Sequence, residues 1–203
     1  MKNFAVLAGV RRHNGAASLV ADPEAKRNIR ETEFKRLVDL LFQHPCVVAV
    51  IGSCSGQSVT GICEAIATEA SAGGSRVVIV SVQTLLASSP VTPPDQTVFS
   101  PGPVGNVWFW PARDGLPREV ADNADSEPQQ DWLDSLRLQY DYILLDCPAP
   151  DTTPASASIA ALADSAVLAV DTARTQRYQL LVNQRSLQLC GVKLSGCILV
   201  NPR

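Results

Sequence analysis

The sequence Val47-Val-Ala-Val-Ile51 is followed directly by Gly52-Ser-Cys-Ser-Gly-Gln-Ser-Val-Thr60. The first stretch is apolar and mostly β-branched, which is typical of a strand buried on both faces. The second stretch consists of small and polar residues apart from Val59, and Thr60–Ser71 then has the pattern of a helix. A strand, a loop of small residues and a helix in this order indicate a phosphate-binding loop.

Such a loop binds an anion because successive backbone N–H groups point inward at the positive end of a helix dipole. In the usual pattern, G-x-x-x-x-G-K-[ST], the lysine bridges two phosphates and the final hydroxyl holds magnesium. When Thr60 is aligned with that hydroxyl, Val59 takes the lysine position and Ser58 the second glycine position. The candidate phosphate-contacting residues are Ser55, Gly56, Gln57, Ser58, Val59 and Thr60. A turn of small residues without a ligand is the alternative that this loop leaves open.

Further apolar runs alternate with helical segments along the chain. We expect strands at Val47–Ile51, Arg76–Val80, Val107–Trp110, Tyr142–Leu145, Ala166–Val170 and Gly196–Val200. We expect helices at Thr60–Ser71, Asp131–Gln139, Ala155–Ala163 and Gln176–Cys190. Strands that alternate with helices form parallel sheets through crossover connections. The sequence therefore predicts an α/β fold, with a mostly parallel sheet and helices on both faces.

Three segments depart from this alternation. Residues 22–42 predict an amphipathic helix, with Asp22 as its cap and Pro23 in its first turn. Residues 88–104 are rich in proline and predict a surface loop, and residues 113–130 predict an acidic loop or a short frayed helix. Because 203 residues have room for one domain of this kind, residues 1–203 are interpreted as a single domain.

A second informative stretch is Gln139-Tyr-Asp-Tyr-Ile-Leu-Leu-Asp-Cys-Pro148. It predicts a strand with Asp146 at its carboxyl end. In nucleotide-binding α/β folds, an aspartate at this place coordinates magnesium directly or through water. Asp146 is therefore the candidate catalytic residue, and Thr60 and Asp146 are the candidate metal ligands. An aspartate that only caps the following loop is the alternative.

Composition limits the possible functions. The chain is 46% hydrophobic and 18% charged, which indicates a folded domain. Its net charge of −3 disfavours nucleic-acid binding through bulk charge. No apolar run reaches about 18 residues, and the start of the chain lacks the order of a secretory signal, so we expect a cytoplasmic protein. The six cysteines lack zinc-site spacing and are interpreted as free thiols.

The stretch Tyr140-Asp-Tyr-Ile-Leu-Leu-Asp-Cys-Pro148 resembles the magnesium-binding segment of bacterial tyrosine kinases of the capsule and exopolysaccharide type. These kinases are relatives of the MinD/ParA deviant P-loop ATPases. The similarity extends over nearly the whole chain. Residues 48–72 resemble the phosphate loop and first helix, and residues 191–201 resemble the last strand, whose terminal asparagine (here Asn201) helps to hold adenine. The resemblance implies a three-layer fold like that of P-loop NTPases.

The expected N-terminal helix adds a separate match. Glu24, Arg27 and Arg30 have the spacing E-x-x-R-x-x-R. In the resembled family, this helix contributes to ring-like self-association, so the resemblance implies a homo-oligomer. A glutamate and an arginine three residues apart also form an ordinary intrahelical pair, and that alternative stays open.

The sequence differs from this family at the charged positions. The family uses a loop lysine, a second-strand aspartate and the magnesium-binding aspartate, and the residues here are Val59, Ser81 and Asp146. Phosphoryl transfer is catalysed almost wholly by positioning and electrostatics. The loss of two of three charged groups therefore predicts a protein that does not catalyse it. We expect no cofactor, or weakly bound ATP or ADP with magnesium.

The resemblance thus predicts a degenerate tyrosine-kinase-like protein that acts without catalysis in exopolysaccharide or capsule biosynthesis or export. The implied partner is an inner-membrane polysaccharide co-polymerase, which would hold the protein peripheral to that membrane. No nucleic-acid partner is expected. One alternative is an active kinase or ATPase with a displaced basic group, for which the candidates are Arg11, Arg12, Arg113 and Arg174. A MinD/ParA-type positioning ATPase is the other alternative.

Overall fold

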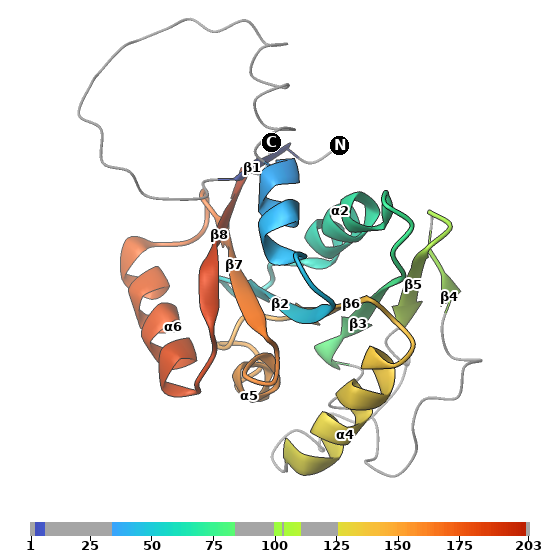
Figure 1. Ribbon diagram of the computed structural model, residues 1–203. Helices are drawn as coiled ribbons and strands as arrows, with labels where there is room; N and C mark the ends of the chain where they lie inside the picture. Colours follow the sequence, from blue (N-terminus) through green and yellow to red (C-terminus); the bar gives the residue numbers. More distant parts are fainter. Residues whose placement is uncertain (1–2, 7–33, 84–99, 103, 111–125, 202–203) are drawn as a thin grey trace, which may run out of the picture.

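The computed structural model describes residues 3–6, 34–83, 100–102, 104–110 and 126–201, which form one sheet covered by helices (Figure 1). The strand order is β1-β8-β7-β2-β6-β3-β5-β4. The strands are β1 (Asn3–Val6), β2 (Cys46–Gly52), β3 (Val77–Ser81), β4 (Ser100–Pro101), β5 (Val107–Trp110), β6 (Tyr142–Cys147), β7 (Ser165–Asp171) and β8 (Leu194–Asn201).

The strands between β8 and β5 in this order are all parallel, which confirms the α/β fold predicted from the sequence. Each lies within about two residues of its expected position. In β2, every residue from Val47 to Gly52 is buried, because helices cover the sheet on both sides. The continuous apolar run, without polar alternation, reflects this double burial.

The sequence does not predict the two short antiparallel strands at the edges of the sheet. β1 pairs with β8, and β4 pairs with β5. The expectation of a loop throughout residues 88–104 is wrong at Ser100–Pro101, which form β4. An edge strand tolerates proline because one of its sides needs no backbone donor. Residues 88–99 and 103 lie outside the described part of the chain.

Helices lie on both faces of the sheet, which confirms the predicted three-layer arrangement (Figure 1). One face is covered by α2 (Thr60–Ser71) and by the helix over residues 34–41. The other face is covered by α4 (Ser126–Arg137), α5 (Ala155–Ala160) and α6 (Arg177–Leu189).

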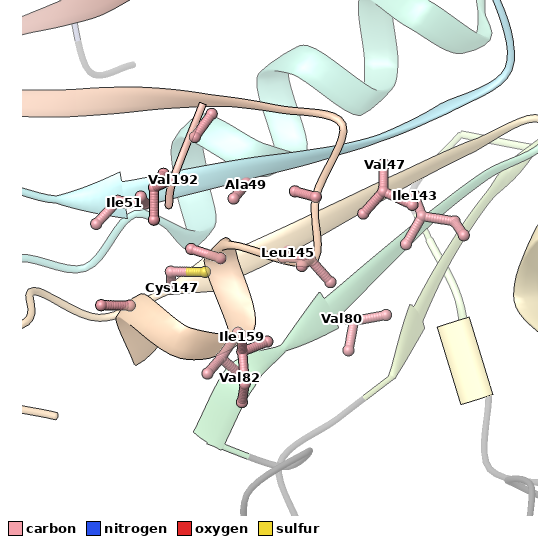
Figure 2. Packing of buried hydrophobic residues seen from close by; sticks show 14 of the residues in the cluster. Val47, Ala49, Ile51, Val80, Val82, Ile143, Leu145, Cys147, Ile159 and Val192 are labelled. Atoms are coloured by element: carbon pink, nitrogen blue, oxygen red, sulfur yellow. The ribbon is translucent and has the colours of Figure 1, made fainter. Parts of the chain in front are cut away.

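Side chains of β2 alternate between two apolar clusters. Val48 and Val50 pack with the cluster that contains α2. Val47, Ala49 and Ile51 pack on the opposite side, in the cluster that includes Ile159 of α5 and Val192 (Figure 2). The strand is thus held from both faces, which fixes the position of the loop that follows it.

Some helix boundaries differ from the expected ones. α4 begins at Ser126 rather than at residue 131, so residues 126–130, expected as a loop or a short frayed helix, belong to this helix, and it ends at Arg137 rather than at residue 139. Pro128 lies in its first turn, where its missing N–H costs no hydrogen bond. α5 ends at Ala160 rather than at residue 163. Of the N-terminal helix expected over residues 22–42, the structure describes residues 34–41 as helix.

Candidate functional site

The loop between β2 and α2 lies at the carboxyl edge of the sheet, beside the end of β6. β2 and β6 are neighbours, and Val50 pairs with Asp146 in their register. The Thr60 hydroxyl, in the first turn of α2, donates a hydrogen bond to Asp146 Oδ2 at 2.6 Å. The two predicted magnesium ligands are thus brought together across 86 residues of sequence.

The end of β3 lies beside Asp146 and carries no second carboxylate. Ser81 pairs with Asp146 in the register of β3 and β6, and Ser81 is the position at which the resembled kinases have an aspartate. Hydroxyl and carboxylate oxygens such as those of Thr60 and Asp146 suit Mg²⁺, which keeps several waters and takes phosphate oxygens as further ligands. The pair fits a magnesium ion that arrives with a nucleotide. In the described ranges, no group of three or more His, Cys, Asp or Glu side chains forms a metal site.

Burial raises the pKa of the Asp146 carboxyl above its ordinary value. The hydrogen bond from Thr60 lowers this pKa in part, and the Glu64 carboxylate raises it again. Because the folded-state pKa is raised, the folded protein holds the proton more tightly than the unfolded chain does. The stability that Asp146 contributes is therefore present below the ordinary carboxyl pKa, and it is lost as the pH rises through the folded-state pKa.

We expect Asp146→Asn to raise the melting temperature more at neutral pH than near pH 4, close to the ordinary carboxyl pKa. The amide oxygen can still accept the hydrogen bond from Thr60, so the variant removes the buried charge and keeps the contact. Thermal unfolding at both pH values measures the difference. Asp39→Asn, at an exposed position in the helix over residues 34–41, is the matched control. An equal effect of Asp146→Asn at both pH values would contradict the raised pKa.

Val59, which the sequence alignment sets at the lysine position of the phosphate-binding pattern, is 1% exposed. Its side chain packs in the cluster of α2 and the sheet, together with Val50 and Ile62. Val59 also caps α2 with its backbone, and its side chain makes no capping hydrogen bond. At this position the loop presents an apolar group to the core and no cation to a phosphate.

The loop is braced from within by the side chain of Gln57. Its Oε1 atom accepts hydrogen bonds from the Ser53 backbone N–H at 2.9 Å and from the Ser53 hydroxyl at 3.1 Å. Gln57 Nε2 is buried and has no hydrogen-bond partner among the described residues. Gln57 was predicted only to contact phosphate, and the structure shows that its side chain also stabilises the loop from within.

Ser53 connects the loop to the segment between β7 and α6. Ser53 is fully buried, and its hydroxyl lies 2.6 Å from the Thr175 hydroxyl. The buried Asn183 side chain of α6 donates to the Ser53 carbonyl oxygen at 2.7 Å. The sequence placed Ser53 at the first glycine position of the phosphate-binding pattern but predicted no role for its side chain, nor for Thr175 and Asn183. The available signal was weak: Thr175 follows the end of a parallel strand, where loops gather at one edge of the sheet.

Asn183→Ala is expected to lower the free energy of unfolding by roughly 1–3 kcal/mol, because the buried Ser53 carbonyl oxygen loses its amide donor. Urea unfolding followed by circular dichroism measures the loss. Gln184→Ala changes the exposed neighbouring position on α6 and is the matched control. A loss no larger than that of the control would show that the contact contributes nothing to the fold.

Arg174 is the candidate arginine that the structure places at the loop. Its guanidinium donates to the carbonyl oxygen of Ser55 at 2.8 Å and to that of Gly56 at 3.4 Å. Gly56 has a φ of 71°, a conformation that favours glycine. The Ser55 hydroxyl is also 3.0 Å from the Thr152 hydroxyl, which follows β6. The loop is therefore held by the segments that follow β6 and β7.

Several predicted site residues are not tested by this geometry. Glu24, Arg27 and Arg30 lie outside the described residues, as do the other candidate arginines, Arg11, Arg12 and Arg113. Asn201 ends β8 and pairs with Asn3 in the register, and its proposed contact with adenine stays a prediction. Ser58 is exposed, and its hydroxyl lies 3.3 Å from that of Thr60.

No family model and no curated protein match this chain. Solved structures do match it. The BceF tyrosine kinase domain superposes with a TM-score of 0.65 at 19% identity, covering 84% of this chain and 74% of that one. The fold is that of bacterial tyrosine kinase domains. The kinase domain of Escherichia coli tyrosine kinase ETK gives a TM-score of 0.68 at 14% identity, covering 88% and 75%. The resemblance predicted from the sequence is confirmed at the level of the fold.

A second group of matching structures includes nucleotide-binding enzymes. Cobyrinic acid a,c-diamide synthase from Mycobacterium smegmatis, with bound ATP analog and magnesium, has a TM-score of 0.53 at 17% identity. The match covers 74% of this chain and 71% of the synthase. The fold is therefore shared by tyrosine kinase domains and by an enzyme that binds an ATP analog and magnesium.

Proposed function

We propose that this chain is a degenerate tyrosine-kinase-like protein that acts without catalysis in exopolysaccharide or capsule biosynthesis or export. The observation that carries the proposal is the burial of Val59 at the lysine position of the loop. A lysine at that position supplies the charge that binds the transferred phosphate. The fold of a kinase domain is kept here, and the cation that its chemistry requires is replaced by a core residue.

The remaining charged groups support the same proposal. The Thr60–Asp146 pair is intact, and Ser81 lies beside Asp146 where the resembled kinases have a second carboxylate. A site of this kind would bind ATP or ADP with magnesium weakly or not at all. Magnesium, if it arrived with the nucleotide, would be held by Thr60 and Asp146 and would neutralise phosphate charge.

The proposed partner is an inner-membrane polysaccharide co-polymerase, and the proposed state is a homo-oligomer built through the helix that contains Glu24, Arg27 and Arg30. Both come from the resemblance of the sequence to the capsule and exopolysaccharide kinases. No helix in the described ranges has the length and apolar character needed to cross a membrane. From the same resemblance, we propose that the protein is cytoplasmic and reaches the membrane through its partner.

Polymer production tests this function. A strain that lacks the gene is complemented with the wild-type protein or with Asp146→Asn, and both are expected to restore polymer to the same level. Loss of polymer with Asp146→Asn, while the protein is folded and abundant, would show that an active nucleotide site is required. Unchanged polymer in the strain without the gene would remove the protein from this pathway. Co-purification with the cytoplasmic part of the co-polymerase tests the partner.

Arg174 favours a second candidate function, an active ATPase or kinase with a displaced cation. Its guanidinium already donates a hydrogen bond to the loop, at 2.8 Å from the Ser55 carbonyl oxygen. Its present acceptors are carbonyl oxygens, so a role in phosphate binding would require the guanidinium to leave them. This candidate would be established if the wild-type protein hydrolyses ATP, if Arg174→Ala abolishes the hydrolysis, and if Arg177→Ala leaves it intact. Arg177 is exposed at the start of α6 and is the matched control.

A further inference from the structure

Exposed apolar side chains gather on one helix of this protein. Across the described residues there are six large exposed apolar side chains, and four of them lie on α6. Tyr178 is 76% exposed, Leu181 56%, Val182 42% and Leu189 80%. Single exposed apolar residues are normal on a protein surface, whereas a group on one element indicates an interaction site.

The spacing of these residues places them on one face of α6. Residues 178, 181, 182, 185 and 189 follow the i, i+3, i+4, i+7, i+11 pattern of a helical stripe. The opposite face is used for the core, because Leu187 and Asn183 are buried there. We call Tyr178, Leu181, Val182, Arg185 and Leu189 the α6 stripe. α6 thus has two apolar faces, one that packs in the core and one that is exposed.

The charge of α6 indicates what would cover this stripe. The helix contains no aspartate or glutamate, and its charged residues are Arg177 and Arg185. Both are exposed, and Arg185 lies within the stripe between Val182 and Leu189. A guanidinium among apolar side chains matches a carboxylate, because its planar fork binds both carboxylate oxygens.

We propose that the α6 stripe is a docking surface for an amphipathic helix of another protein, whose apolar stripe includes an acidic residue that pairs with Arg185. A helix of 13 residues offers about 20 Å of contact, enough for three to four turns of a partner helix. Apolar anchors would pack against Tyr178, Leu181 and Leu189, and a carboxylate would pair with Arg185. This inference does not depend on the function proposed above.

Two other occupants fit the stripe less well. A second copy of α6 would bring arginines and no carboxylate to the contact, and like charges across an interface are unfavourable. A lipid surface suits a continuous apolar face, and here Arg185 interrupts that face in its middle. The charge pattern therefore favours an acidic protein helix.

Site-specific photo-crosslinking of the full chain in its own host cells tests the proposal. Benzoylphenylalanine is placed at position 181 and, as a control, at Thr68, an exposed position on α2 on the other face of the sheet. We expect an adduct from position 181 and none from position 68. Mass spectrometry of the adduct is expected to identify a helical segment of another protein with an apolar stripe that includes an acidic residue.

The contribution of Arg185 is measured in the same assay. Arg185→Glu is expected to reduce the adduct from position 181 by about tenfold or more, and Arg185→Lys to retain most of it. Because position 185 is exposed, the melting temperatures of both variants should match that of the wild type. The proposal is overturned if no adduct forms at position 181, if the crosslinked segment belongs to this chain or has no acidic residue in its apolar stripe, or if Arg185→Glu has no effect. The protein is also sedimented with anionic vesicles. If it binds them and Leu181→Glu abolishes the binding, the stripe contacts a lipid surface and the proposal is overturned.

Discussion

Incubation of the wild-type protein with Mg-ATP is expected to yield no phosphotyrosine and no ATP hydrolysis above background. The transferring phosphoryl group would meet Asp146 but neither a lysine at position 59 nor a carboxylate at position 81. Removal of one preorganised charged or hydrogen-bonding group costs about a hundredfold or more in rate, and two such groups are missing here. The Thr60–Asp146 pair cannot compensate, because it supplies no positive charge of its own and would only hold a metal ion that arrived with the nucleotide.

The kinase domain of Escherichia coli tyrosine kinase ETK, which shares this fold, is the positive control for the assay. Release of radioactive phosphate and an anti-phosphotyrosine blot are measured side by side for both proteins. The Asp146→Asn variant sets the background. Activity of the wild-type protein clearly above that of Asp146→Asn would contradict the proposed non-catalytic role, and Arg174→Ala would then show whether the displaced arginine supplies the cation.

Replacement of Val59 by Lys together with Ser58→Gly is expected to strengthen Mg-ATP binding by roughly tenfold to a hundredfold. A charge-assisted hydrogen bond is worth about 1.5–3 kcal/mol, and each 1.4 kcal/mol changes the dissociation constant tenfold. The wild-type protein, without this group, is expected to bind Mg-ATP with a millimolar constant or not measurably. Titration calorimetry measures both proteins under the same conditions.

The same substitution removes a buried apolar side chain. Val59 is 1% exposed, so its loss from the core is expected to cost about 1–3 kcal/mol of folding free energy. The double variant Val59→Met, Ser58→Gly is the matched control, because its long side chain disturbs the same packing without adding charge. Equal affinity of the two double variants, with both folded in thermal unfolding, would contradict a role for the missing charge.

Much of the fold follows from short stretches of sequence. Val47–Ile51 and the run that ends at Asp146 are apolar without alternation, which requires strands covered on both faces. Such strands belong in a parallel sheet, and parallel strands align their carboxyl ends at one edge. That logic placed Thr60 beside Asp146, and the hydrogen bond between them confirms it. The edge strands β1 and β4 were not predicted. Each pairs with one neighbouring strand only, so its form depends on that partner more than on its own propensity.

The sequence by itself determined that the lysine is absent and that Thr60 and Asp146 remain, because the type of residue at a position in a strand–loop–helix motif is a local property. Only the tertiary structure decided what replaces the missing charge and what holds the loop. Val59 proved to be a core residue, Arg174 lies on the Ser55 carbonyl oxygen, and Asn183 secures Ser53 from more than a hundred residues away. These contacts join β2 to the segment after β7, and their partners are set by the order of strands in the sheet. The positions of the strands along the sequence do not reveal their order in the sheet, since each crossover can place its strand on either side of β2.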